Sequence, residues 1–314
     1  PACRDSRRRP RWQAPCTAER QPVRGDVTYT VTFWGTRGSI PTPGAHTARY
    51  GGNTSCVAVS GARDQLVILD AGSGIRPLGR ELSRLSSGPM NLDILLTHTH
   101  WDHIQGLPFF QPLSMKGNTV HIFGAAQAGV PLEEILDRQM DPVVFPVPLK
   151  ALAADLTITE VVHGSFEIDG FLVEAFRLRH PGTTLGYKLV PAKGGRTIAY
   201  LTDNELGSGG SYDVGPDWRR KLVRFLGGVD TLIHDGMYSE AMIEARAGWG
   251  HSTPEQAVRL AREAGCRRLV LFHHEPEHDD GDIDALLIGA RSFAAVHAPG
   301  LLVDAAMEGM SLTL

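Results

Sequence analysis

The stretch LLTHTHWDHIQGL at residues 95–107 constrains the fold more than any other part of the chain. It places His98, His100, Asp102 and His103 close together, directly after the apolar run DILLT. Burying such a cluster without a partner would strip its polar atoms of their hydrogen bonds to water. A bound metal ion satisfies all of them, and imidazole and carboxylate ligands suit zinc, manganese or iron better than calcium or magnesium. The stretch therefore predicts a metal site at the end of a buried strand.

The spacing within this stretch favours two adjacent ligand clusters. His98 and His100 are two positions apart at the end of a predicted strand, so their imidazoles point the same way. Asp102 and His103 come after the chain has turned, so they can face a neighbouring point.

The same arrangement recurs at other predicted strand ends. The chain has 13 histidines, and a single one at a strand end is usually a structural residue with satisfied hydrogen bonds. Repetition argues against that interpretation here, because apolar runs are followed at once by ligand-type side chains at Asp70, His180, Asp203, His234, Asp235, His273 and His274. His234 is left open between supporting a ligand and a purely structural role, and His274 and His278 between the surface and the substrate mouth.

Composition limits the class of protein. The chain has 314 residues, 42% hydrophobic and 21% charged, and a net charge of −4, which is typical of a globular protein. The small net charge argues against nucleic-acid binding by charge alone. No apolar run reaches the roughly 20 residues that span a bilayer, so no membrane partner is expected. The scattered cysteines, at positions 3, 16, 56 and 266, favour reduced thiols and a cytoplasmic location.

Residues 1–25 differ from the rest. They are rich in arginine and proline and poor in apolar residues, which predicts a disordered basic tail without the apolar core of a secretory signal. An idle tail is favoured over a nucleic-acid or membrane contact. Residues 26–314 are predicted to form a single domain.

Hydrophobic patterning in that domain predicts alternating strands and helices. The strands expected lie in VTYTVTFWG, CVAVSG, QLVILDAG, DILLTH, TVHIFG, three runs within 156–180 separated by turns at Gly164 and Gly170, TLGYKLV, TIAYLTD, DTLIHDG and RRLVLFHH. The helices expected lie in IRPLGRELSRL, in the capped HSTPEQAVRLAREAG and over 282–297. This order predicts an α/β fold with two sheets sandwiched between helices.

Four stretches together resemble the metallo-β-lactamase-fold hydrolases. HTHWDH at 98–103 has their HxHxDH signature, and FWGTRGSIPTPG, LIHDGMYSEAM and GWGHSTPEQAVRLAREAGCRRLVLFHH resemble segments of the tRNase Z-like enzymes and related phosphodiesterases. The resemblance covers roughly residues 28–314. It implies a four-layer αββα sandwich.

The resemblance also implies a binuclear metal site. One ion would be held by His98, His100 and His180, a second by Asp102, His103 and His273, and both by a bridging Asp203. Zinc is the expected metal, with manganese and iron as alternatives. Asp70 and Asp235 are expected to orient ligand imidazoles by accepting their other N–H.

Two residues are candidates for catalysis beyond holding metal. A hydroxide that bridges two ions can attack phosphorus at neutral pH, and the departing alkoxide needs a proton. The resemblance assigns His251 to protonating the leaving oxygen or contacting the phosphate. Asp102 is a candidate for accepting a proton from the attacking water.

The expected substrate is a small phosphodiester, such as a cyclic nucleotide or cyclic phosphate. Only residues 181–202 separate His180 from Asp203, too few for the protruding arm that long-chain RNA processing enzymes of this family insert there, so a large nucleic-acid substrate is not expected. The alternatives are a tRNA 3′-processing endonuclease, a lactone, thioester or β-lactam hydrolase, and a non-catalytic binding module. The resemblance also suggests a homodimer.

The glycine-rich segment GTRGSIPTPGAHTARYGGNTS is expected near the site. It carries Arg37 and Arg49, which are suited to holding a phosphate. It lacks the spacing of a P-loop, so no single residue in it is predicted to bind.

Overall fold

The computed structural model describes residues 28–61, 65–168 and 170–314. The predicted tail at 1–25 lies outside the described residues, so its disorder and its role stay predictions. Across the described ranges, no helix is long and apolar enough to cross a membrane.

Two seven-stranded sheets form the centre of the described chain. The first has the order β14-β1-β2-β3-β4-β5-β6, with β1 (Thr30–Gly35), β2 (Cys56–Ser60), β3 (Leu66–Leu69), β4 (Asn91–Leu95), β5 (Thr119–Gly124), β6 (Asp155–Glu160) and β14 (Ser311–Thr313). The second has the order β13-β12-β11-β10-β9-β8-β7, with β7 (Gly164–Ile168), β8 (Phe171–Arg177), β9 (Leu185–Pro191), β10 (Ile198–Leu201), β11 (Thr231–Asp235), β12 (Arg268–Phe272) and β13 (Leu302–Ala305).

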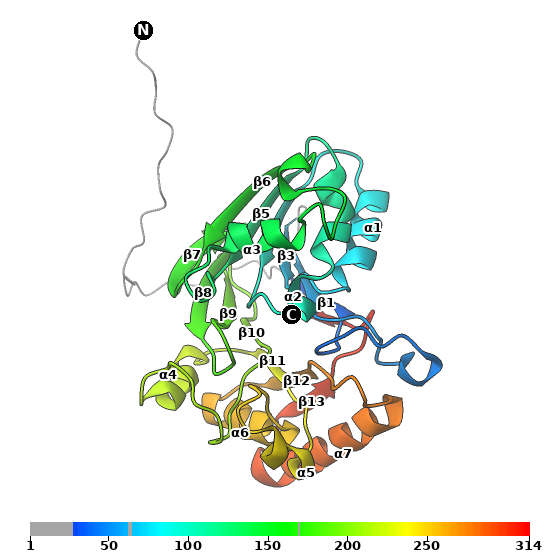
Figure 1. The fold of residues 1–314 in the computed structure, drawn as a ribbon. Coiled ribbons are helices and arrows are strands. Elements are labelled where there is room, and N and C mark those ends of the chain that lie inside the picture. Colours follow the sequence, from blue (N-terminus) through cyan, green and yellow to red (C-terminus); the bar gives the residue numbers. More distant parts are fainter. Residues whose placement is uncertain (1–27, 62–64, 169) are drawn as a thin grey trace.

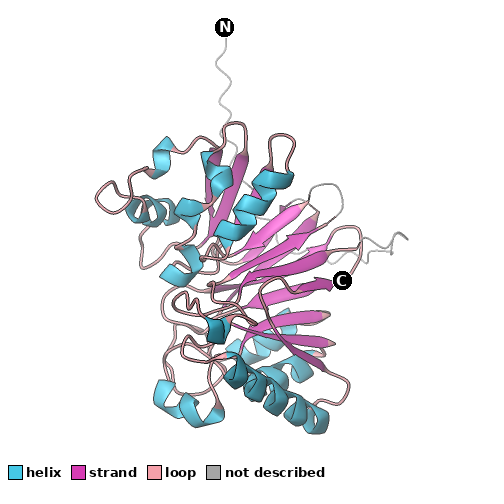
Figure 2. Cartoon of the chain, turned by 90° about the vertical axis from the view of Figure 1, so that its right-hand side faces the viewer, coloured by secondary structure: helices cyan, strands magenta, loops and turns pink. Residues whose placement is uncertain are grey.

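Helices lie on the outer sides of these sheets (Figures 1 and 2). The α-helices are α1 (Ile75–Leu85), α2 (Trp101–Ile104), α3 (Leu132–Gln139), α4 (Trp218–Phe225), α5 (Glu240–Ile243), α6 (Pro254–Ala264) and α7 (Asp280–His297). Short 3₁₀ turns lie at Ala45–Thr47, Leu107–Phe109, Gln111–Ser114, Leu149–Ala151 and Glu244–Arg246.

The apolar side chains form three cores, which define four layers. The central core lies between the sheets and joins residues such as Phe33 and Leu69 of the first sheet to Tyr187 and Phe272 of the second. A second core packs α1 and α3 on the outer face of the first sheet, and a third packs α4, α6 and α7 on the outer face of the second. The predicted αββα sandwich is therefore confirmed.

The direction of the strands gathers the polar strand ends. Strands β3 to β6 run parallel in the first sheet, and β10 to β13 run parallel in the second. Since carboxyl ends of parallel strands share one edge of a sheet, ligands tend to bind there in α/β folds. The two such edges face each other across the sandwich.

The turn predicted at Gly164 is instead the first residue of β7, and residues 161–163 make the connection from β6. The strands on either side of residues 161–163 do not form a hairpin, because β6 is the edge of the first sheet and β7 is the edge of the second. The chain crosses between sheets here. Periodicity identifies strands, but it carries no information about which sheet a strand joins.

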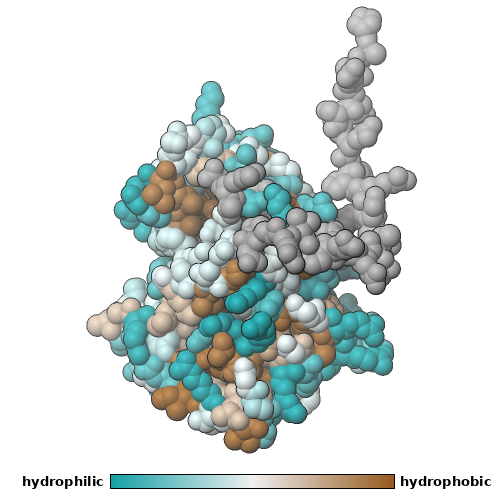
Figure 3. Space-filling view, turned by 180° about the vertical axis from the view of Figure 1, so that it is seen from behind, coloured by the Kyte–Doolittle hydropathy of each residue, from teal (hydrophilic) through white to brown (hydrophobic). Residues whose placement is uncertain are grey.

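The surface seen from behind shows hydrophobic residues scattered among hydrophilic ones over the lower part of the molecule (Figure 3). Such mixing is normal for a folded domain, because there is too little polar surface to cover it completely.

Candidate metal centre

The predicted ligands meet at the facing edges of the two sheets. The turn after β4 carries His98 and His100, and α2 carries Asp102 and His103. His180 follows β8, Asp203 follows β10, and His273 follows β12, all contributed by the second sheet. Every one of these side chains except His100 is buried.

Backbone strain marks the same strand ends. Asp70, Asp203 and His273 have φ values of 61°, 51° and 61°, and Ser39 has 58°. Residues other than glycine seldom adopt this left-handed conformation, and such strain gathers at functional sites. Asp203 and His273 belong to the predicted ligands, and the Ser39 amide donates to Asp102 Oδ2 at 2.8 Å.

The first cluster consists of His98, His100, His180 and Asp203, whose ligand atoms all lie within 4.8 Å of one another. His180 Nε2 lies 3.0 Å from His100 Nδ1 and 3.6 Å from Asp203 Oδ2. His98 Nε2 lies 3.4 Å from the same Asp203 oxygen. Nitrogen lone pairs and a carboxylate thus converge on a single point.

The second cluster consists of Asp102, His103, His273 and Asp203, within the same distance limit. His273 Nε2 is 3.1 Å from both Asp102 Oδ2 and Asp203 Oδ1. His103 Nε2 is 3.2 Å from Asp102 Oδ2 and 3.3 Å from Asp203 Oδ2. Asp203 is therefore shared between the clusters.

The electrostatics of these residues fit bound cations. The buried Nε2 atoms of His98 and His103 have no hydrogen-bond partner within the described chain. Burial lowers the pKa of His98 well below its usual value and that of His180 to about 4, so both imidazoles are neutral and offer a lone pair. Burial raises the pKa values of Asp102 and Asp203, but neighbouring imidazoles outweigh it and hold them well below the usual range.

Asp70 supports the second cluster from beneath. Its Oδ2 accepts from His103 Nδ1 at 2.8 Å and from the Tyr200 hydroxyl at 2.9 Å. Its Oδ1 accepts from the backbone N–H and the hydroxyl of Thr97, at 2.7 and 3.0 Å. This fully buried carboxylate fixes the His103 ring so that Nε2 points to the cluster. Thr97 and Tyr200 carry no sequence signal that distinguishes them.

His251 and Asp235 form a pair beside the clusters. His251 Nδ1 donates to Asp235 Oδ2 at 2.7 Å, and the His251 ring stacks on His273 with ring centres 5.2 Å apart. Burial lowers the pKa of His251, but the Asp235 carboxylate outweighs it and raises that pKa above its usual value. Asp235 therefore orients His251 rather than any ligand of the two four-residue clusters.

The family follows from comparison with known proteins. The family model described as the beta-lactamase superfamily domain matches residues 66–274, which contain all of these strand ends. The chain belongs to the beta-lactamase superfamily. The resemblance identified in the sequence is thereby confirmed, and this superfamily member is a metal-dependent hydrolase.

Relatives of this superfamily member cover nearly its whole length. A Ribonuclease Z of Myxococcus xanthus (strain DK1622) is 28% identical, over 90% of this chain and 97% of its own. The metallo-beta-lactamase fold protein YhfI from Bacillus subtilis has a TM-score of 0.65 at 18% identity, covering 91% of this chain and 100% of its own. Human tRNase Z, short form, has a TM-score of 0.59 at 23% identity, covering 90% and 98%.

The ribonuclease names conflict with the expectation that a large nucleic acid is not a substrate. Net charge alone does not support that expectation, because it averages over the whole surface and does not describe the mouth of a site.

Glu205, which the sequence did not indicate, binds backbone amides of the segment next to the two ligand clusters. Glu205 is buried and accepts from Gly210 N, Tyr212 Oη, Gly248 N and Gly250 N, at 2.6–3.1 Å. Gly250, with φ of 90°, passes so close to His180 that a Cβ there would lie 2.0 Å from His180 Nδ1. Its carbonyl accepts from that nitrogen at 3.0 Å, which sets the orientation of the ligand. Gly248 and Gly250 lie 43 and 45 positions from Glu205, so spacing alone did not reveal these contacts.

The glycine-rich segment contacts the second cluster through the Ser39 amide, but its two arginines are held by other contacts. Arg37 is fully buried and donates to the carbonyls of Gly51, Glu275 and His278. Arg49 forms an ion pair with Asp284 at the surface. The suggestion that these arginines hold a phosphate is therefore not supported, since both are engaged in structural contacts.

The structure also shows the surroundings of two histidines whose roles the sequence left open, His274 and His234. His274 is buried and its Nε2 donates to the Ala306 carbonyl, so the surface interpretation was wrong. His234 donates from Nδ1 to the Asp235 carbonyl and accepts at Nε2 from Asn204, which gives it structural contacts.

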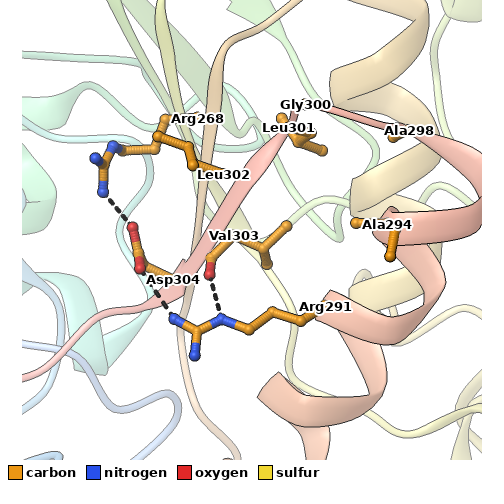
Figure 4. A pocket seen from close by; sticks show the side chains of 10 residues that line it. Arg268, Arg291, Ala294, Ala298, Gly300, Leu301, Leu302, Val303 and Asp304 are labelled. Carbon is orange, nitrogen blue, oxygen red and sulfur yellow. Dashed lines mark hydrogen bonds and ion pairs between the residues drawn. The ribbon is translucent and has the colours of Figure 1, made fainter.

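A cavity lies between α7 and β13, apart from the two ligand clusters (Figure 4). Arg268 and Arg291, the two arginines in its lining, are both held by Asp304. None of the predicted site residues lines it.

Proposed function

We propose that this chain is a binuclear metal-dependent phosphodiesterase that acts on a small phosphodiester, such as a cyclic nucleotide or a cyclic phosphate. The pairing of His251 with Asp235 beside the two ligand clusters carries the proposal. A phosphodiester leaving group departs as an alkoxide, and a buried imidazole with a raised pKa is suited to giving it a proton.

The first cluster and the second cluster would each hold one divalent ion, with Asp203 between them. The ions would supply Lewis acidity and a nucleophile from water at neutral pH. Zinc is proposed because imidazole nitrogens and carboxylate oxygens dominate both clusters. Manganese and iron remain alternatives.

The chain's own residues would orient and protonate the substrate. Asp235 holds the Nδ1–H of His251, so Nε2 is left to face the leaving oxygen. Asp102, fixed by the Ser39 amide and next to His103 and His273, is proposed to accept the proton that the attacking water loses. Asp70 keeps His103 in place during the reaction.

The connection between His180 and Asp203 supports a compact substrate. It contains β9 and β10, which pair antiparallel, joined by a short turn. There is no space in it for a protruding RNA-binding arm.

RNA is the second candidate substrate, and the relatives' names favour it. The Ribonuclease Z of Myxococcus xanthus aligns over nearly the whole of both chains. Processing of a tRNA 3′ end is cleavage of a phosphodiester, so it requires the same His251 and the same clusters. A homodimer and a cytoplasmic location stay predictions.

The test compares purified wild type with His251→Ala and His98→Ala, with metal content measured on every sample. The substrates are bis-4-nitrophenyl phosphate, cyclic AMP, a tRNA precursor with a 3′ trailer, an acyl-homoserine lactone and nitrocefin. We expect His251→Ala to lose about 10²- to 10⁴-fold in kcat on cyclic AMP and the tRNA precursor, whose leaving groups are alkoxides, while it retains its metal. His98→Ala should lose metal and activity together.

Three outcomes are decisive. Hydrolysis of only the lactone or nitrocefin by the wild type would make the proposal wrong. Full activity of a metal-loaded His251→Ala on cyclic AMP or the tRNA precursor would remove the proton-donor role. Efficient cleavage of the tRNA precursor, without turnover of cyclic AMP, would assign the chain to RNA processing.

A further inference from the structure

The segment just before His251 presents a large aromatic side chain to solvent. Trp249 is 55% exposed although its backbone is firmly held. The amides on either side, Gly248 N and Gly250 N, donate to the same Glu205 Oε2 at 2.8 and 3.1 Å. Both glycines have left-handed φ values, 84° and 90°, which few other residues adopt. The chain thus fixes the backbone around an exposed indole at the edge of the metal centre.

A stack of side chains links this indole to His251. The Arg246 guanidinium lies 4.7 Å from the centre of the Trp249 ring and 6.0 Å from that of Tyr238. The Tyr238 ring in turn meets the His251 ring edge-on, with centres 5.6 Å apart. Arg246 thus lies against both the Tyr238 ring and the Trp249 ring. Its position orders the indole from one side and leaves the exposed part of the ring to a ligand.

The chemistry of such a surface matches a nucleobase. Base–aromatic stacking needs only a flat ring held in place, and a neighbouring guanidinium adds to the attraction. A group attached to the phosphate that reacts at His251 would extend over the nearby Trp249. Because Gly250 also contacts His180, the platform and the cluster are two ends of the same short segment.

We propose that Trp249 is a stacking platform for a nucleobase attached to the scissile phosphate, with Arg246 and Tyr238 holding it in place. The inference rests on the phosphodiesterase function proposed above and deepens it, because it names the substrate class as nucleotide esters. The base belongs either to a free nucleotide or to the end of an RNA chain. Both present the same ring to the platform.

A second exposed tryptophan provides the matched control. Trp101 is 78% exposed at the start of α2, between two predicted ligands. In the described structure, no cation lies over its ring, so it lacks the support that Trp249 has.

The experiment compares two esters that release the same 4-nitrophenol. One is thymidine 5′-(4-nitrophenyl phosphate), and the other is tetrahydrofurfuryl 4-nitrophenyl phosphate, which keeps a sugar-like ring but has no base. The readout is the ratio of their kcat/KM values in wild type, Trp249→Ala, Trp249→Phe and Trp101→Ala. Metal content is measured for each protein.

We expect the wild type to prefer the thymidine ester and Trp249→Ala to lower that ratio by about tenfold, through KM. Trp249→Phe should restore most of the ratio, because a phenyl ring still stacks. Trp101→Ala should leave the ratio as in the wild type. Two inhibitors distinguish the sources of the base. Stronger inhibition by uridine would indicate a free nucleotide, and stronger inhibition by a short oligoribonucleotide with a 3′ uridine would indicate an RNA end.

Several results would overturn the inference. Equal kcat/KM for the two esters in the wild type, or an unchanged ratio in metal-loaded Trp249→Ala, would show that Trp249 binds no base. A fall in the ratio in Trp101→Ala alone would place the base on the other side of the centre. If the wild type hydrolyses neither ester but cleaves cyclic AMP or the tRNA precursor, this inference fails and the phosphodiesterase proposal stands; if it cleaves no phosphodiester, both fail.

Discussion

Asp70 is a buried carboxylate that orients the predicted ligand His103 without belonging to either cluster. Both of its oxygens only accept hydrogen bonds, from Thr97, His103 and Tyr200. A carboxylate suits this position because it has no donor of its own to oppose these three groups.

Asp70→Asn is expected to weaken metal binding by about 10- to 100-fold. The amide must turn its NH₂ toward a donor, either Thr97 on one side or His103 and Tyr200 on the other. Metal titration followed by elemental analysis measures the affinity. Tyr200→Phe is the control: it removes one donor without creating an opposed pair, so its effect should be smaller. An Asp70→Asn protein with wild-type metal affinity would contradict the orienting role.

His234 gives the chain a defined sensitivity to acid. Its Nδ1 donates to the Asp235 carbonyl and its Nε2 accepts from Asn204, so the folded protein needs the neutral ring. Burial lowers its pKa below the ordinary value. The unfolded chain therefore takes up a proton at His234 that the folded chain does not, once the pH falls below about 6.5.

The free energy of unfolding should consequently decrease as the pH falls from about 6.5, by up to about 1.4 kcal/mol per pH unit for this residue. In His234→Asn the amide can still donate to the Asp235 carbonyl but does not titrate. We expect that variant to be less stable at neutral pH and to have a shallower pH dependence by up to one proton. Urea denaturation between pH 5 and pH 7.5 measures the slopes, and parallel slopes would exclude His234 as a contributor.

At the scale of elements, α6 is the helix that sequence patterning predicted best. Thr253 caps it, Pro254 begins it, and Gly265 ends it with φ of 73°. The Thr253 side chain accepts from Gln256 N while the Gln256 side chain accepts from Thr253 N, which is a complete capping box. His251 precedes this helix by three positions, so the cap also anchors the proposed acid.

Removing that cap should lower both stability and activity. We expect Thr253→Ala to decrease the free energy of unfolding by about 1 kcal/mol. It should also reduce kcat, because the segment that carries His251 loses one of its fixed ends. Thr253→Ser keeps the hydroxyl and serves as the control. Thermal denaturation and phosphodiester kinetics give the two values, and equal stability of Thr253→Ala and Thr253→Ser would contradict the capping role.

Local signals explain which elements could be predicted. Helix α6 depends on residues that are neighbours in sequence, so its caps and periodicity identify it. The crossing from β6 to β7 depends on which sheet each strand joins, and that choice is made by packing across the central core. The short helices α2 and α5 have only four residues each, too few for a periodic pattern.

The residues of the site divide in the same way. Strand ends, spacing and family resemblance predicted the residues that the structure brings together in the two clusters, and also His251 and Asp70. Glu205 and Trp249 lie two positions from Asp203 and His251, but sequence spacing does not show the hydrogen bonds to Glu205 or the Arg246 guanidinium over the Trp249 ring. Arg37 was assigned the wrong environment because its acceptors at 51, 275 and 278 are remote along the chain.

At the scale of the whole molecule, metal binding should stabilise the αββα sandwich in addition to supplying the proposed reactive centre. Each cluster combines ligands that follow β4 with ligands that follow strands of the second sheet. A ligand present at about 100 times its Kd stabilises the folded state by about 2.7 kcal/mol. We expect chelation to lower the Tm by several degrees. His98→Ala should show a smaller difference between loaded and chelated protein, and an identical Tm with and without metal would contradict a link between the sheets.

The second sheet supplies His180, Asp203 and His273 in that order, and His273 follows β12 near the far end of the chain. A nascent chain on the ribosome therefore holds an incomplete second cluster until almost all of the domain has been made. Because the proposed reaction uses both clusters, we expect no hydrolysis from a chain whose second sheet has not yet formed.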